Sequence, residues 1–89
     1  MLMVRHAIGS RLFLQTEDYS VIPEGENWVI IAAAKNEELE NLMAFKDELN
    51  LFVVGEHEKT WYYSSDASIK IVDSDKVQVT ADHKTVYPV

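Results

Sequence analysis

Three histidines, His6, His57 and His83, are the side chains of this sequence best suited to chemistry near neutral pH. His57 stands between two glutamates, and His83 follows an aspartate. A zinc site needs three or four such ligands converging on one point. The spacing does not match His-Glu-x-x-His or any other paired histidine motif. We therefore expect the histidines to occupy turns, and we expect no metal and no cofactor.

Nucleophiles and phosphate loops give equally weak signals. The serines form neither a Gly-x-Ser-x-Gly elbow nor a Ser-x-x-Lys pair. Gly9, Gly25 and Gly55 stand alone, so there is no glycine-rich loop to cradle a phosphate. The sequence therefore predicts a protein that is not an enzyme, with no catalytic residues. A small metal-dependent or acid–base enzyme stays open as a third alternative, because 15 acidic residues place some carboxylates close together.

The acidic charge of the chain is its clearest property. Fifteen Asp and Glu against eight Lys and Arg give a net charge of −7 over 89 residues. More than half of that charge lies in residues 35–60, which carry seven carboxylates against three cations. Affinity for nucleic acid comes largely from Lys and Arg that neutralise phosphates. The charge thus argues against direct nucleic-acid binding and favours a protein partner with a basic surface.

The composition excludes several classes of protein. At 47% hydrophobic residues, the chain is too apolar for a disordered tail. Its longest uncharged apolar run, Trp28–Ala34, is far shorter than the ~20 residues that cross a bilayer. The N-terminal residues lack the pattern of a secretory signal, and the absence of cysteine rules out disulfides. We expect one cytoplasmic domain over residues 1–89, with no membrane contact.

Turn residues divide this domain into strands. Gly9-Ser10 and the loop 23–27 interrupt apolar segments, since Pro fixes φ and Gly permits positive φ. Trp28–Ala33 is predicted as a strand from its aromatic and β-branched front half, although the alanines also suit the start of a helix. Further strands are predicted at 11–16 and 19–22 (one strand or two), 51–54, 61–63, 68–71, 76–80 and 85–87. Alternation predicts a hairpin that buries one set of side chains, namely Ile69, Ile71, Val77 and Val79.

One amphipathic helix is predicted from residue 37 to about residue 49. Asn36 is a suitable N-cap because its side-chain oxygen can accept a hydrogen bond from a free N–H of the first turn. At 100° per residue the apolar side chains share one side, apart from Lys46, which falls in their midst. The opposite side carries an acidic arc: Glu37, Glu40, Asp47 and Glu48. The fold class is therefore α+β, an antiparallel sheet of about five to six strands with this helix packed on it.

The aromatic run Trp61-Tyr62-Tyr63 places Trp61 and Tyr63 on one face of a strand and Tyr62 on the other. One face belongs to the core. We assign Tyr62 to the wet face, as a contact for a partner, because Trp and Tyr are enriched at protein interfaces. The alternative is that Tyr62 only covers its own sheet, with its hydroxyl in water.

The function predicted from these residues is a non-catalytic protein-interaction domain. It would be a small acidic adaptor or inhibitor of the type that phages and mobile elements encode. The expected contacts are the acidic arc and Tyr62, and in the sharpest form of the hypothesis the arc mimics nucleic acid on a nucleic-acid-binding protein. The alternative is a structural or assembly subunit whose acidic face keeps it soluble. A homodimer is expected through strand edges at Leu2–Ile8 and Thr85–Tyr87.

Overall fold

The computed structural model describes residues 1–46, 48–63 and 68–88. This part of the chain forms nine strands and one helix. In chain order they are β1 (Leu2–His6), β2 (Leu12–Thr16), β3 (Tyr19–Glu24), β4 (Asn27–Ala33), α1 (Asn36–Ala44), β5 (Leu49–Val54), β6 (Glu58–Tyr63), β7 (Ser68–Asp73), β8 (Lys76–Ala81) and β9 (His83–Pro88).

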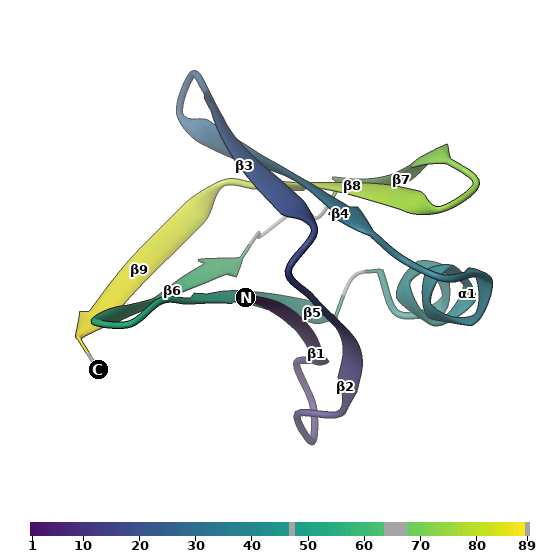
Figure 1. Ribbon diagram of the computed structural model, residues 1–89, viewed down its shortest axis with the longest axis horizontal. Coiled ribbons are helices and arrows are strands. Elements are labelled where there is room, and N and C mark those ends of the chain that lie inside the picture. Colours follow the sequence, from purple (N-terminus) through teal and green to yellow (C-terminus); the bar gives the residue numbers. More distant parts are fainter. Residues whose placement is uncertain (47, 64–67, 89) are drawn as a thin grey trace.

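The strands form two antiparallel sheets that face each other (Figure 1). The five-stranded sheet has the order β2-β1-β5-β6-β9, and the four-stranded sheet has the order β3-β4-β8-β7. Figure 1 shows the four-stranded sheet above the five-stranded one, with α1 beside their ends. The α+β class is confirmed at this level, but the expectation of a single sheet of five to six strands is wrong. The inner face of the five-stranded sheet is covered mainly by the four-stranded sheet, and the helix contributes only part of the core.

The core lies between the two sheets. Its buried residues include Leu2, Val4, Leu51 and Tyr62 from one sheet, Ile30, Val77 and Val79 from the other, and Leu39 and Leu42 from α1. Burying a side chain the size of Leu or Ile contributes about 1.5–3 kcal/mol. Each sheet therefore stabilises the other by covering its apolar inner face.

The chain changes sheet between β2 and β3, where residues 11–22 could have been one strand. Thr16 Oγ1 accepts a hydrogen bond from the N–H of Asp18 at 3.0 Å, which turns the backbone. The carbonyl of Asp18 then accepts from the N–H of Ala33 in β4 at 3.0 Å. This short turn ends one strand and starts another, which is why two sheets form.

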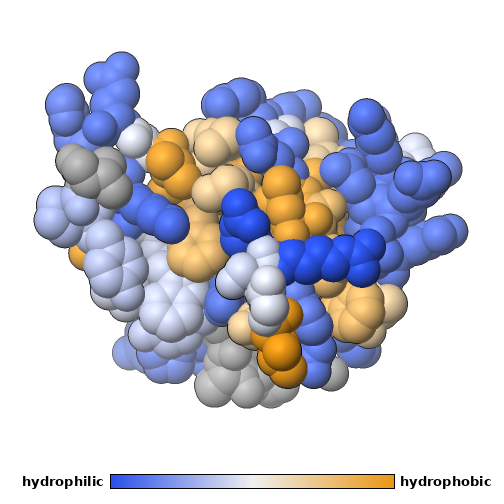
Figure 2. Space-filling model, turned by 90° about the horizontal axis from the view of Figure 1, so that it is seen from below, coloured by the Kyte–Doolittle hydropathy of each residue, from blue (hydrophilic) through white to orange (hydrophobic). Residues whose placement is uncertain are grey.

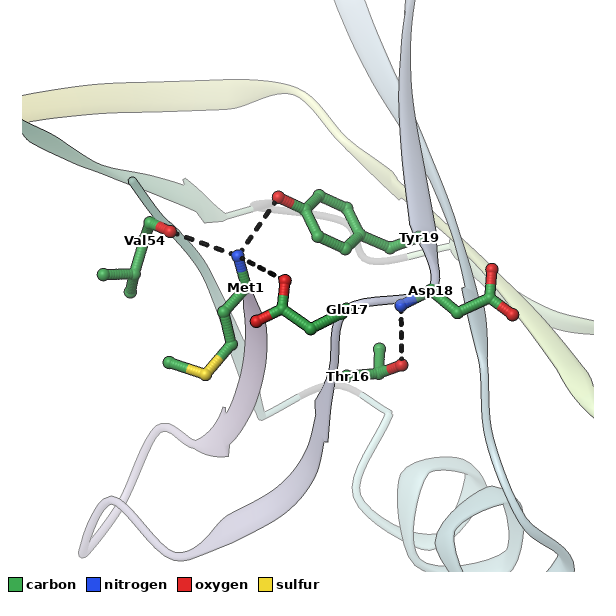
Figure 3. A network of polar contacts seen from close by, with 6 residues as sticks. All are labelled: Met1, Thr16, Glu17, Asp18, Tyr19 and Val54. Carbon is green, nitrogen blue, oxygen red and sulfur yellow. Dashed lines mark hydrogen bonds and ion pairs between the residues drawn. The ribbon is translucent and has the colours of Figure 1, made fainter. Parts of the chain in front are cut away.

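A second set of polar contacts ties β1, β3 and β5 together (Figure 3). The backbone nitrogen of Met1 donates to the carbonyl of Val54 at 3.1 Å and to the hydroxyl of Tyr19 at 3.4 Å. The same nitrogen lies 3.5 Å from a carboxylate oxygen of Glu17. These contacts join the two sheets at one margin of the core.

The strand predicted at Trp28–Ala33 is confirmed as β4, a central strand between β3 and β8. The predicted hairpin is confirmed as β7 and β8, in which Ile71 stands opposite Val77. Val77 and Val79 are buried, but Ile71 is 49% exposed, so the expectation that all four side chains are buried is wrong. The reason is that β7 is an edge strand, and its register shifts between Ile71 and Asp73.

The helix begins where expected but ends earlier, at Ala44 rather than near Leu49. Leu49 instead starts β5 and pairs with His6 of β1, so sheet pairing overrides the helical pattern. Lys46 therefore lies outside the helix, which removes its conflict with the apolar side. The expected N-cap was also wrong. Lys35 occupies that position, and its N–H donates to Glu38 Oε1 at 2.8 Å.

The prediction of two edge strands is confirmed for one of them and wrong for the other. β9, which contains Thr85–Tyr87, is an edge of the five-stranded sheet, whereas β1 lies inside it between β2 and β5. Within the described ranges, the protein has no helix with the length and apolar character needed to traverse a bilayer.

Candidate protein-interaction surface

The structure keeps the three histidines apart. His6 packs against Phe13 and Phe45 at the end of β1, with ring centroids 5.6 Å and 4.9 Å away. His57 is exposed in the turn before β6, and His83 begins β9. The described residues hold no group of three His, Cys, Asp or Glu side chains that could bind a metal ion.

The acidic arc does not form on one helix. Glu37 and Glu40 are exposed on α1, as expected. Glu48 follows the helix, and its Oε2 lies 2.6 Å from His6 Nε2. Asp47 lies outside the described residues. Of the predicted contact residues that the structure describes, only Glu37 and Glu40 therefore share a solvent-exposed helical face.

Tyr62 lies in the core, so its assignment to the wet face was wrong. Its side chain is 7% exposed, and its ring centroid lies 6.2 Å from that of Trp28 in the opposite sheet. Burial raises the pKa of its hydroxyl above 10.0, and the neighbouring Tyr19 and Glu58 raise it further. Trp61 and Tyr63, on either side in sequence, therefore point away from the core.

These outward side chains belong to a continuous row of rings across three strands. Phe52 of β5 stacks on Trp61 of β6, with centroids 6.4 Å apart. Trp61 lies 4.2 Å from Tyr63, and Tyr63 stacks on His83 of β9 at 5.0 Å. The register explains the row, because Phe52 stands opposite Trp61 and Tyr63 stands opposite His83. We call these four residues the ring ladder.

Trp61, the second ring of the ladder, is held by a polar contact. The indole N–H of Trp61 donates to Asn50 Oδ1 on β5 at 3.1 Å. Trp61 and Asn50 line an open groove of about 340 Å³ together with Phe52, Lys59 and Tyr87. The groove is wide enough to accept an apolar side chain from a partner, because it lies within the size range of ligand pockets.

The charged groups on this surface are basic, although the protein is acidic. Lys59 Nζ lies 4.4 Å from the centre of the Phe52 ring, a cation–π contact. Arg5 of β1 donates through Nη1 to the carbonyl of Ser10 at 2.8 Å. The alternation of the described strands places the following residues on this outer face: Met3, Arg5, Asn50, Phe52, Lys59, Trp61, Tyr63, His83, Thr85 and Tyr87. None of them is Asp or Glu.

We call this set of residues the aromatic face. Figure 2 views the molecule from that side and shows pale blue and light orange surface next to a strongly hydrophilic strip. Clusters of Trp, Tyr, Phe, Met and Arg with few acids are typical of the centre of protein interfaces. Comparison with protein-family models, curated proteins and solved structures gives no match.

Proposed function

We propose that this protein is a non-catalytic protein-binding domain that contacts its partner through the aromatic face. The observation that carries the proposal is the ring ladder, Phe52–Trp61–Tyr63–His83, on a sheet face turned away from the core. A buried sheet face already supplies the core, so these rings are not needed to hold the two sheets together. The lack of cysteine fits a reducing cytoplasm, which we take as the compartment.

The ring geometry favours a protein over a single-stranded nucleic acid. Bases bind by stacking on the flat faces of aromatic rings. In the ladder Tyr63 already stacks on His83, with an interplanar angle of 10°, and Trp61 meets Tyr63 at a centroid distance of 4.2 Å. Lys59 covers the Phe52 ring. Neighbouring side chains therefore already contact these rings, and a net charge of −7 opposes a polyanion.

The partner that fits this face presents an apolar patch with carboxylates at its margin. An apolar side chain of the partner fills the groove beside Trp61. Its carboxylates face Lys59, which lines the groove, and Arg5, which stands opposite Asn50 on the same sheet face. Truncation of such a central aromatic residue commonly costs 2 kcal/mol or more, about 30-fold in affinity.

The test uses the partner captured from a native lysate at low salt. Immobilised wild-type protein is compared with Trp61→Thr/Tyr63→Thr, which keeps strand propensity, and with Ile22→Thr, which removes an exposed apolar residue from the other sheet. We expect the first variant to lose the captured protein and the second to retain it. Retention by a folded Trp61→Thr/Tyr63→Thr variant refutes the proposal.

In a second candidate function, the partner binds the acidic side of α1. Glu37 and Glu40 are exposed, and neither forms an ion pair with a cation among the described residues. They could meet the basic surface of a nucleic-acid-binding protein as a nucleic-acid mimic. Glu37→Gln/Glu40→Gln, tested in the same capture experiment, weakens binding at low salt only if this second candidate is correct.

A further inference from the structure

An edge strand can pair with a strand of another chain. Three of the four edge strands in the described sheets carry features that hinder such pairing. The β1–β2 register shifts between Val4 and Arg5, and the β7 register shifts between Ile71 and Asp73. β3 carries Pro23 within the strand, which removes a backbone donor. These are the devices by which proteins prevent sheets from joining.

The fourth edge, β9, lacks these devices. It pairs with β6 at six consecutive positions, from Glu58–Pro88 to Tyr63–His83, with no register shift. Its proline is the last residue of the strand, so residues 83–87 keep every backbone N–H. In Figure 1, β9 is the yellow strand along the left margin of the molecule, with its outer side open.

The side chains of β9 also favour pairing. Val86 is 47% exposed and Tyr87 is 43% exposed, on opposite faces of the strand. The charge of Lys84 does not oppose pairing at this edge, because its ammonium lies over the Trp28 ring, 5.2 Å from the ring centre. The strand contains His83 and Lys84 but no carboxylate, so the net negative charge of the protein is not concentrated here.

We propose that β9 binds β9 of a second copy of this chain, antiparallel about a twofold axis at Thr85. In this register Thr85 stands opposite Thr85 of the second copy, and Tyr87 stands opposite His83. Val86 then stands opposite Lys84. A twofold axis at Thr85 pairs all of residues 83–87 and leaves Pro88 outside the ladder, whereas an axis at Val86 would place Pro88 opposite Lys84.

The dimer joins the two five-stranded sheets into one continuous sheet. On the outer side, Tyr87 of the second copy extends the ring ladder beyond His83, so the two aromatic faces become one surface. On the inner side, Val86 packs against the alkyl chain of Lys84. The inference does not depend on the proposed partner, because it concerns only the edge of the sheet.

The first test is the molar mass of the wild-type protein by light scattering and sedimentation as its concentration rises. We expect an increase from 10.2 kDa toward twice that value. Thr85→Lys and Thr85→Asp should each stay at the single-chain mass, because like charges then oppose each other across the axis. An equimolar mixture of these two variants should regain the doubled mass. A wild-type protein that stays at 10.2 kDa, or a doubled mass that neither variant changes, overturns the proposal.

The second test uses single cysteines, which the natural chain lacks. Directly opposed Cα atoms lie about 4.5–5.5 Å apart in an antiparallel pair, within the ~4.4–6.8 Å span of a disulfide. Thr85→Cys should therefore form a covalent dimer under mild oxidation. The matched control, Val86→Cys, should not, because the two cysteines are offset along the strands. Equal cross-linking of both variants, or none in Thr85→Cys, overturns the register even if the charged variants fail to fold.

Discussion

His6 Nε2 lies 2.6 Å from Glu48 Oε2, and this contact fastens the end of β1 to the segment that follows α1. The backbone supports the same junction, since the N–H of Ala7 donates to the carbonyl of Glu48 at 2.7 Å. The imidazole is mostly buried against Phe13 and Phe45, whereas the carboxylate is partly in water. The contacts of Glu48 therefore give it a structural role that does not involve a partner.

A double-mutant cycle with His6→Gln and Glu48→Gln measures that contact. We expect a coupling free energy of about 0.5–1 kcal/mol at neutral pH, the upper part of the range for partly exposed pairs. The measurement is urea denaturation of the four proteins at low salt. A coupling indistinguishable from zero contradicts the contact and leaves Glu48 free for another role.

Val77→Asp and Ile71→Asp form a matched pair in the β7–β8 hairpin. The two residues stand opposite each other, but Val77 is 2% exposed and Ile71 is half exposed. An unpaired carboxylate at position 77 should lower the free energy of unfolding by at least ~3 kcal/mol. At position 71 the loss should stay at about 1 kcal/mol or less. Thermal and urea denaturation check both values, and equal losses would show that the two positions share the same environment.

Alkaline pH should destabilise the protein through Tyr62. Its pKa in the folded protein is raised above 10.0 by burial, and further by Tyr19 and Glu58. The unfolded chain therefore releases this proton first as the pH passes 10.0, and the stabilisation present below that pH is lost as the pH approaches the folded pKa. Tyr62→Phe should lose less stability than wild type between neutral and alkaline pH. Urea denaturation at both pH values tests this expectation, and identical losses in the two proteins would contradict it.

Local patterns in the sequence predict most of the strands. The β-branched half of Trp28–Ala33 and the alternation around Val77 and Val79 define β4 and the β7–β8 hairpin, because these patterns report one buried face. They do not report which sheet a strand joins. That depends on the turn at Glu17–Asp18, where the carbonyl of Asp18 accepts a hydrogen bond from the N–H of Ala33 in β4, fifteen positions further along the chain.

The aromatic face is harder to predict for a related reason. Alternation separates Trp61 and Tyr63 from Tyr62 but does not say which set is buried. Which face is buried depends on Trp28, whose ring contacts Tyr62 across the core from a strand more than thirty positions away. Likewise, the helical period continues through Leu49, and only the pairing of Leu49 with His6 reveals that the helix has already ended.

The strands of the two sheets are interleaved along the chain, and this order affects how the protein folds. β1, β2, β5, β6 and β9 alternate with β3, β4, β7 and β8, so β1–β5, β4–β8 and β6–β9 pair across long stretches of intervening chain. Each such pairing closes a large loop before its contacts offset the lost entropy, which slows folding in proteins dominated by distant contacts. Neither sheet can be completed from one continuous stretch of chain, so the two sheets must assemble and open together.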